Sequence, residues 1–269
     1  MATRLEAPAE EPRSVEEEAV RLEEVTRRYP RRRGGPVVAL EGFDLSVRAG
    51  EVVAVVGPSG CGKSTLLELV AGLQDPDAGR VVVGKGGSAA ERRTASAFMP
   101  QHDLLLPWRD AIGNAALALE CAGVQRGEAR RRAAPLFERF GLGRFERARP
   151  SELSGGMRQR VAFLRTLLVG RPVLLLDEPF GALDSITRGS MQDWLADALA
   201  AEPRTVLLVT HDVDEALVLA DRVAVLSPRP AHVRTELVVD LPRPRRRREL
   251  VTEPAFAELK ARAMEVLEA

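Results

Sequence analysis

At residues 57–65 the chain reads Gly57-Pro58-Ser59-Gly60-Cys61-Gly62-Lys63-Ser64-Thr65, which follows the pattern G-x-x-x-x-G-K-[ST]. The preceding residues, 51–56, form a short apolar run rich in valine, which is typical of a buried parallel strand. The following residues, 65–71, begin a helical pattern of leucine and valine. The sequence therefore predicts a strand, a tight glycine loop and a helix in direct succession.

This loop has the residue types that bind the phosphates of a nucleoside triphosphate. Gly57, Gly60 and Gly62 allow backbone conformations and a close approach that a Cβ atom would prevent, so that N–H groups can surround an anion. The helix that begins near Lys63 directs its partial positive end to the same place. We expect Lys63 to reach the β- and γ-phosphates and the hydroxyl of Ser64 to ligate Mg²⁺.

Composition narrows the class of protein. Of the 269 residues, 45% are hydrophobic, which is enough for a sizeable core, and Lys plus Arg equal Asp plus Glu at 39 each. The formal net charge is therefore zero, and no electrostatic field of the whole chain attracts it to nucleic acid. The two cysteines, Cys61 and Cys121, form neither a disulfide framework nor a metal-binding pattern, which fits a reducing compartment. No apolar run approaches the roughly 20 residues that span a bilayer, so we expect a soluble chain that another protein holds at any membrane.

The first part of the chain contains several short strand patterns. Residues 1–19 are rich in Ala, Pro, Glu and Arg and are predicted to form a disordered leader. Strand patterns follow at residues 20–26, 37–40 and 43–47, before the first helix. Their crowding predicts an antiparallel β-subdomain that lies against a parallel core.

The rest of the chain separates into helical and alternating parts. Helical spacing at 112–122 and 126–140, with no strand between, predicts an α-helical subdomain over about 102–168. From residue 173 the order strand, loop, helix repeats, as in a doubly wound α/β core with a mainly parallel sheet. We therefore expect one ATPase domain over 20–241, followed at 242–269 by a basic linker and a helix.

With these parts in place, the chain from about Leu22 to Pro228 resembles the ATP-binding subunit of an ABC transporter. The most specific motif is Leu153-Ser-Gly-Gly-Met-Arg-Gln-Arg160, which matches the signature of that family. The other motifs occur in the family's order: Gln101 in the Q-loop, the acidic strand 173–178, the D-loop Gly181-Ala-Leu-Asp184 and the switch histidine His211.

The residues and the resemblance predict the same chemistry. Asp177 follows a buried strand and is expected to hold Mg²⁺, because a hard cation prefers carboxylate and water ligands. Glu178 is expected to be the general base that activates the attacking water. The resemblance implies that His211 contacts the γ-phosphate and that water, and that Gln101 senses the γ-phosphate or Mg²⁺.

The resemblance also implies how ATP is held between two chains. Tyr29 is expected to stack on adenine, although an exposed tyrosine in a Pro/Arg loop is the alternative. The signature residues Ser154, Gly155 and Gly156 begin a helix and form a second anion site, far from the chain's own phosphate loop. A homodimer of two-fold symmetry is therefore implied, in which the signature completes the ATP site of the other copy. Asp184 of the D-loop is expected to be a further ATP-binding residue.

One segment indicates the type of transporter. Leu104-Leu105-Leu106-Pro107-Trp108 resembles the corresponding part of importers of nitrate, sulfonate or taurine, and related importers carry a thiamine-pyrimidine precursor. The resemblance implies a subunit on the cytoplasmic face of the cell membrane, bound to permease subunits and indirectly to a solute-binding protein. The apolar cluster is expected to line the groove that receives the permease, and the alternative is that it belongs to the core.

Other classes of ABC ATPase differ from this chain in their sequence features. ABC proteins of DNA repair carry long coiled coils or zinc cysteines, translation factors carry two cassettes, and an exporter or another non-importer ATPase would not need the 104–108 pattern. The arginine run 243–248 is expected to be a solvated linker, with contact to anionic lipid as the alternative. Cys61 lies within the phosphate loop, so alkylation of its thiol is expected to block ATP binding.

Overall fold

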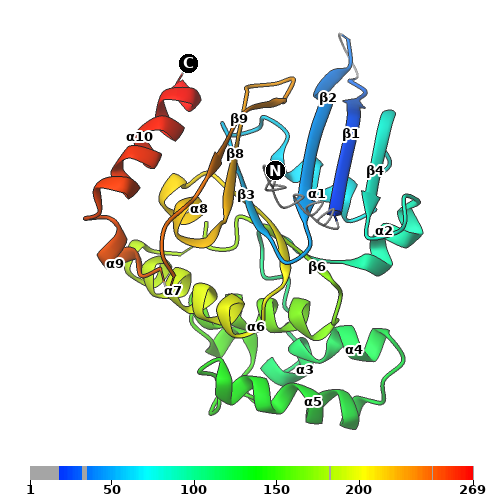
Figure 1. The fold of residues 1–269 in the computed structure, drawn as a ribbon. Coiled ribbons are helices and arrows are strands. Elements are labelled where there is room, and N and C mark those ends of the chain that lie inside the picture. Colours follow the sequence, from blue (N-terminus) through cyan, green and yellow to red (C-terminus); the bar gives the residue numbers. More distant parts are fainter. Residues whose placement is uncertain (1–17, 32–34, 182, 244, 269) are drawn as a thin grey trace, which may run out of the picture.

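Two β-sheets meet at helix α1 (Lys63–Val70) in the computed structural model of the chain (Figure 1). The structure describes residues 18–31, 35–181, 183–243 and 245–268. The leader predicted over 1–19 therefore lies almost entirely outside the described residues, and strand β1 already begins at Glu18.

The larger sheet brings the predicted motifs to one edge. Its six strands are, in spatial order, β5 (Ser96–Met99), β6 (Val173–Asp177), β7 (Thr205–Thr210), β3 (Val52–Val56), β8 (Arg222–Leu226) and β9 (Val233–Val238). All neighbours pair in parallel except β8 and β9, which are antiparallel. Since parallel strands end at the same edge, the loops after β3, β6 and β7 lie together, as the doubly wound order predicts.

Both faces of this sheet are buried, which explains its apolar strands. Along β3, Val53 and Val55 belong to one hydrophobic cluster, shared with α1 and the smaller sheet. Val52, Ala54 and Val56 belong to the other, shared with the helices on the opposite face. Because successive side chains of a strand point to opposite faces of the sheet, β3 contributes to both hydrophobic clusters.

The smaller sheet is antiparallel and has the order β2-β1-β4, with β1 over Glu18–Tyr29, β2 over Val37–Arg48 and β4 over Ala78–Val83. The two strands predicted at 37–40 and 43–47 are in fact one. Gly42 lies between them with a φ of 53°, and the strand continues through it because glycine tolerates this conformation. Helix α2 (Ala89–Ala95), which the sequence did not predict, follows β4 and begins with a capping box of Ser88 and Glu91.

Three helices lie at the lower end of Figure 1, namely α3 (Ala111–Ala115), α4 (Leu117–Cys121) and α5 (Arg126–Arg139), and a 3₁₀ turn at Pro150–Glu152 follows them in the chain. The single helix predicted over 112–122 is interrupted at Ala116. Asn114 is fully buried and its amide donates to the carbonyl groups of residues 106, 109 and 110, which fixes α3 to the preceding loop. No residue of α4 is fully buried, and Leu119 packs only partly buried against the core.

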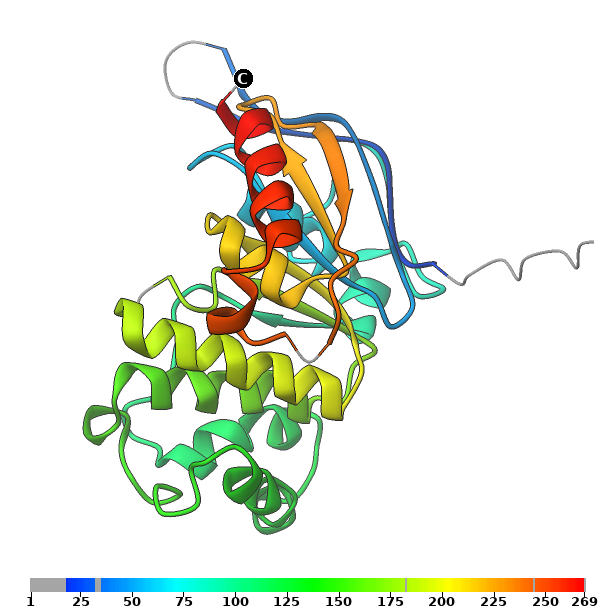
Figure 2. The same ribbon diagram turned by 60° about the vertical axis from the view of Figure 1, so that its left-hand side comes forward.

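Four helices complete the second face of the large sheet: α6 (Gly155–Leu168), α7 (Ser185–Ala201), α8 (Val213–Leu219) and α10 (Pro254–Glu268). A short helix, α9 (Arg247–Leu250), connects the sheet to α10. In Figure 2, α10 runs beside β8 and β9. No helix in the described part of the chain is long and apolar enough to cross a membrane.

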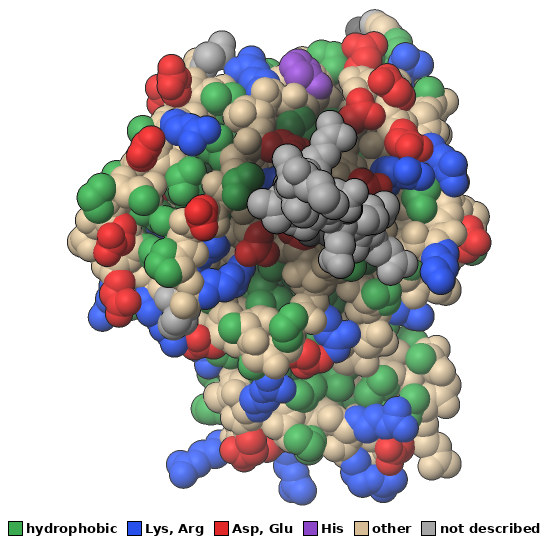
Figure 3. Space-filling view, viewed as in Figure 1, with side chains coloured by type: hydrophobic (Ala, Val, Ile, Leu, Met, Phe, Trp, Pro, Cys, Tyr) green, Lys and Arg blue, Asp and Glu red, His purple; other side chains and the backbone are tan. Residues whose placement is uncertain are grey.

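The expectation of a solvated linker at 243–248 does not hold for Arg245, which is buried, whereas Arg243 and Arg248 are exposed. Arg245 is only 4% exposed, and its guanidinium donates to backbone carbonyl groups, among them those of Val239 and Leu241. Arg246 pairs with Asp197 at 2.9 Å. The positions of Arg245 and Arg246 therefore depend on carbonyl groups and on a carboxylate that the local sequence does not reveal. Elsewhere on the surface in Figure 3, basic and acidic side chains are interspersed.

Candidate nucleotide-binding and catalytic site

The glycine loop joins β3 to α1 as predicted. Lys63 is only 6% exposed, and its Nζ donates to the carbonyl oxygens of Gly57 at 2.7 Å and Pro58 at 3.0 Å. Gly62 has a φ of 133°, and a Cβ there would lie 3.0 Å from the carbonyl oxygen of Ala39. Only glycine fits this position, so the loop can turn directly into the helix N-terminus.

Ser64 and Asp177 lie together at the end of β6. Burial raises the pKa of the Asp177 carboxyl above its usual value, and a hydrogen bond from the Ser64 side chain opposes this shift. Asp177 is 7% exposed. A hydroxyl and a buried carboxylate beside a phosphate loop are hard oxygen donors, which suit Mg²⁺. The described residues contain no cluster of three or more His, Cys, Asp or Glu that could hold a metal ion.

The next residue, Glu178, is where the proposed catalytic side chains meet. Its Oε2 accepts a hydrogen bond from Gln101 Nε2 at 3.1 Å and lies 3.2 Å from His211 Nδ1. The three residues come from the ends of β5, β6 and β7, which are neighbours in the sheet. Glu178 has a φ of 42°, an unusual value for a residue other than glycine, and its N–H donates to the Val209 carbonyl at 2.8 Å. The turn after β6 thus holds the carboxylate toward the other two side chains.

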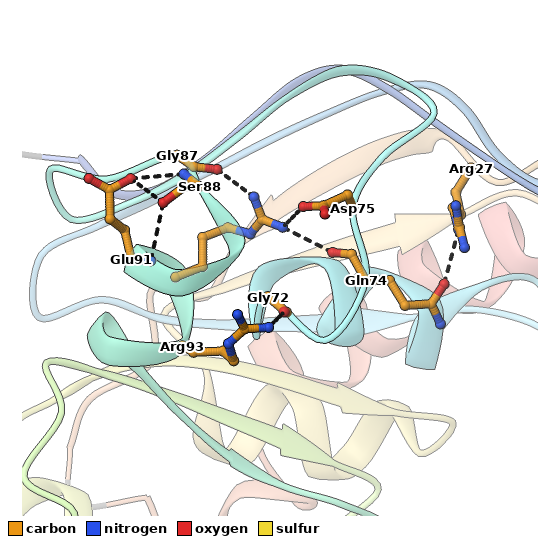
Figure 4. Close-up of polar contacts among 9 residues, drawn as sticks. Arg27, Gly72, Gln74, Asp75, Gly87, Ser88, Glu91 and Arg93 are labelled. Carbon is orange, nitrogen blue, oxygen red and sulfur yellow. Dashed lines mark hydrogen bonds and ion pairs between the residues drawn. The ribbon is translucent and has the colours of Figure 1, made fainter.

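Tyr29 ends strand β1 and is fixed by polar contacts that the sequence did not indicate. Its hydroxyl lies 3.2 Å from Thr65 Oγ1 and donates to Gln74 Oε1 at 3.1 Å. Arg27 also donates to Gln74 Oε1, and its guanidinium lies 5.1 Å from the centre of the Tyr29 ring. Figure 4 shows Arg27 directed toward Gln74 in this network. The ring is therefore held beside the first turn of α1, next to the phosphate loop.

The same close-up shows how the segment after α1 is fixed. The side chain of Arg92, only 2% exposed, donates to the carbonyl oxygens of Gly87 and Gln74 and pairs with Asp75 at 2.8 Å. Its three partners are labelled in Figure 4. Gln74 thus has its backbone held by α2 and its side chain held against Tyr29. The antiparallel sheet and α1 are therefore joined next to the candidate adenine site.

The signature residues lie on a different part of the chain. Ser154 is exposed and caps α6, where its Oγ accepts from Met157 N at 3.3 Å. Asp184 caps α7 through hydrogen bonds from the N–H groups of residues 186 and 187. A Cβ at Gly156 would lie 3.0 Å from Thr187 Cγ2, so the starts of α6 and α7 are adjacent. Among the described residues, no hydrogen bond or ion pair connects Ser154 or Asp184 to the loop 57–65.

A cavity of 590 Å³ adjoins the loop and includes residues that sequence reasoning missed. It lies between the phosphate loop, the residues around His211 and helix α10; Arg188, Asp214, Lys260 and Met264 are among its lining residues. Burial raises the pKa of nearby Glu215 to about 8, so this acid is largely protonated at neutral pH. No local pattern marks these side chains, since they come from α7, α8 and α10.

Cys61 is 2% exposed, so an alkylating reagent has little access to its thiol, and the prediction that alkylation blocks ATP binding stays a prediction. Burial raises the pKa of Cys61, so less of the reactive thiolate is present at any pH below that value. In a Cys121→Ser variant, we expect iodoacetamide to modify Cys61 at least about tenfold more slowly than it modifies the exposed Cys121 of a Cys61→Ser variant. The rate should rise as the pH rises above 8. Mass spectrometry over time gives both rates, and equal rates at pH 7.5 would contradict the prediction.

These features together define a nucleotide-binding protein of the phosphate-loop class. The chain belongs to the ABC transporter family, since the profile of that family matches residues 40–181. It therefore carries the ABC ATPase domain, and the predicted fold class is confirmed.

Several relatives have curated names. The formylaminopyrimidine import ATP-binding protein ThiZ of Halalkalibacterium halodurans is 45% identical over 82% of this chain and 85% of its own length. The nitrate import ATP-binding protein NrtD of Synechococcus elongatus is 44% identical over 87% and 86%. The aliphatic sulfonates import ATP-binding protein SsuB 1 of Rhodococcus jostii is 50% identical over 77% and 80%.

A solved structure is similar as well. The ATP-binding cassette MJ0796, in a dimeric post-hydrolysis state bound to ADP and Pi, superimposes with a TM-score of 0.72 and 31% identity. The match covers 82% of this chain and 99% of that one. The predicted resemblance to the importer-type ATP-binding subunits is thus confirmed at the level of sequence and fold.

Proposed function

We propose that the protein is the ATP-hydrolysing subunit of a membrane importer and that it uses Mg²⁺ with ATP. The observation that supports this most directly is the meeting of Gln101, Glu178 and His211 at the sheet edge that carries the phosphate loop. Phosphate release from MgATP by the purified protein, alone and with its permease, tests the proposal. No phosphate release under either condition would contradict it.

In the proposed reaction, Glu178 is the general base. Its carboxylate orients a water for attack on the γ-phosphorus and takes a proton from that water. Gln101 and His211 hold the carboxylate from two sides, because each is within hydrogen-bond distance of Oε2. Lys63 would exchange its contacts with Gly57 and Pro58 for the β- and γ-phosphates, whose developing charge it stabilises.

Ser64 and Asp177 would hold Mg²⁺, with Gln101 as a further oxygen donor. When bound, the cation would neutralise phosphate charge and stabilise ADP as the leaving group. Asp177 is suited to this role because its carboxylate is buried and lacks a cationic partner within ion-pair distance among the described residues. Tyr29 would stack on the adenine base, which contributes about 1–3 kcal/mol to binding.

The complete site would need two copies of the chain. Ser154, Gly155, Gly156 and Asp184 lie at the starts of α6 and α7 and would close over the ATP of the other copy. A two-fold dimer then contains two equivalent sites, each made from one phosphate loop and one signature. The dimeric form of the related cassette supports this arrangement.

Permease binding is proposed at residues 104–108. The structure divides this apolar cluster, because Leu105 is buried whereas Leu104 is 61% exposed and Trp108 is 69% exposed. The backbone φ of Leu104 is 45°, an unusual value for a residue other than glycine, and the chain turns at this surface position. Two exposed apolar side chains on one loop fit a helix of a partner protein.

The relatives indicate the class of solute. We propose nitrate, a sulfonate, taurine or a related small solute, and a thiamine-pyrimidine precursor is the alternative suggested by the formylaminopyrimidine importer. A solute-binding protein outside the membrane would deliver it. The subunit would then act on the cytoplasmic face of the membrane, with 20–241 as the ATPase domain, 102–168 as its helical subdomain and 242–269 as a C-terminal addition.

We expect Trp108→Glu to weaken permease binding at least about tenfold, because a charge would replace a large apolar anchor. ATP binding should remain at the parent level, since the residue is on a surface loop away from 57–65. Co-purification with the permease and ATPase assays of the assembled transporter measure the two effects. Leu73→Glu is the matched control, because Leu73 is a large apolar residue with 56% exposure elsewhere on the surface. Equal effects of both variants would contradict the proposed docking site.

A further inference from the structure

Helix α8 directly follows the switch residue His211. Its N-cap is Asp212, whose side chain accepts from Glu215 N at 3.2 Å, and the Asp212 N–H donates to Thr210 Oγ1 at 3.0 Å. His211 thus lies between the fixed end of β7 and the first turn of α8. Since His211 comes immediately before the N-cap of this helix, a shift of α8, which has seven residues, also moves the histidine.

The C-terminal segment, residues 243–268, contacts the first turn of α8 through ion pairs. Asp214 is 14% exposed and pairs with Lys260 of α10 at 2.7 Å. The same carboxylate pairs with Arg247 of α9 at 3.3 Å. One side chain of α8 therefore connects this end of the helix to both helices of the C-terminal segment.

The segment also contacts the other end of α8. The buried guanidinium of Arg245 donates to the carbonyl oxygens of Leu217 and Ala220. Arg243 donates to the Leu219 carbonyl at 3.4 Å and pairs with Asp221 at 2.6 Å. Cations at a helix C-terminus satisfy its free carbonyl groups and interact favourably with the helix dipole.

Apolar packing brings α10 against α8 as well. Phe256 and Ala263 of α10 are buried in the same hydrophobic cluster as Ala216 and Leu217 of α8. Figure 2 shows α10 running along this side of the molecule, next to β8 and β9 and above α8. Lys260 and Met264 then reach the cavity that His211 and Pro58 also line.

We propose that the C-terminal segment positions the switch histidine by holding α8 at both ends. Asp214 and Lys260 are positioning residues in this arrangement, since they act through α8 and, within the described part of the chain, form no hydrogen bond or ion pair with the phosphate loop. The inference rests on the proposed role of His211 in ATP hydrolysis. It gives residues 243–268 a role in positioning His211 for ATP hydrolysis. These residues lie outside the stretch that the family profile matches, 40–181.

The main test is Asp214→Asn, which removes the charge that both Lys260 and Arg247 contact. We expect kcat for ATP to fall about fivefold with little change in KM, because nucleotide binding by the loop is untouched while His211 is displaced. The matched control is Asp197→Asn, which breaks the pair of Arg246 with α7 in the same segment but leaves α8 alone. Equal kcat values for the two variants would overturn the inference.

A second variant separates positioning from a loss of stability. Lys260→Met removes one ion pair on the α10 side, and we expect a smaller fall in kcat that Lys260→Arg restores. Thermal unfolding should change no more in Lys260→Met than in Asp197→Asn, since Lys260 is 45% exposed and Asp214 keeps its pair with Arg247. A fall in kcat that only follows the unfolding temperature would contradict the proposal.

A spectroscopic readout addresses His211 directly. The chain has only three histidines, so the imidazole signals can be assigned in NMR spectra by their loss in single variants. Asp214→Asn and Lys260→Met should move the His211 signal, whereas Asp197→Asn should not. An unmoved His211 signal would overturn the inference.

Combining variants separates this inference from the proposed function. In a His211→Ala background, Asp214→Asn should cause no further fall in kcat if it acts through the histidine. The same fivefold fall in both backgrounds would reject the inference alone. Parent activity of His211→Ala by itself would instead reject the proposed role of His211.

Discussion

Glu178→Gln is expected to reduce ATP turnover at least about 100-fold while ATP binding is retained. The amide keeps the size of the side chain and its contact with Gln101 or His211, but it cannot take a proton from water. The loop 57–65 and the Ser64–Asp177 pair remain unchanged, so the nucleotide and Mg²⁺ should still bind. A variant that binds ATP without hydrolysing it should accumulate as an ATP-bound dimer.

Size-exclusion chromatography with light scattering measures this outcome. Addition of MgATP should shift Glu178→Gln from monomer to dimer, and the parent protein should shift less because hydrolysis reopens its dimer. Glu202→Gln is the matched control, since Glu202 follows α7 and its contacts are with Arg139 and Arg204. Turnover of Glu178→Gln at the parent rate would show that another group is the base.

Lys63→Met is expected to weaken ATP binding at least about 100-fold. The buried ammonium would be lost as the donor to two phosphate groups, and each charge-assisted hydrogen bond contributes about 1.5–3 kcal/mol. Ser154→Arg should instead leave the loop intact and prevent closure of the second copy over it, because a long cation replaces an exposed serine. The lost cap of α6 should cost about 1 kcal/mol of stability, which thermal unfolding can verify.

Mixing the two inactive variants tests whether the sites are shared between chains. In a mixed dimer, one site combines both defects and the other combines the intact loop of one chain with the intact signature of the other. If the sites work independently, equal amounts should recover about a quarter of the parent ATPase rate. Phosphate release from the mixture measures this. A mixture no more active than the average of the separate variants would mean that sites are not shared.

The sequence by itself determined the parts of this protein that depend on local patterns. The glycine loop, the carboxylates after a buried run of residues 173–176 and His211 after another such run could be read directly. Parallel strands end at one edge of a sheet, so these predictions also implied that the motifs lie close together. The order of strands and helices after residue 173 was predicted for the same reason, since burial on both faces leaves continuous apolar runs.

Only the tertiary structure decided features that depend on contacts between distant segments. The arginine run looked solvated because its charges were visible and the carbonyl groups that bind Arg245 were not. Leu104 and Leu105 are alike in sequence, yet one is exposed and the other buried, because the backbone turn at Leu104 separates their directions. The attachment of residues 243–268 to α8 likewise depends on Asp214, Lys260 and packed side chains that no local pattern joins. Backbone partners and burial are properties of the whole fold, whereas strand period and glycine spacing are properties of a few neighbouring residues.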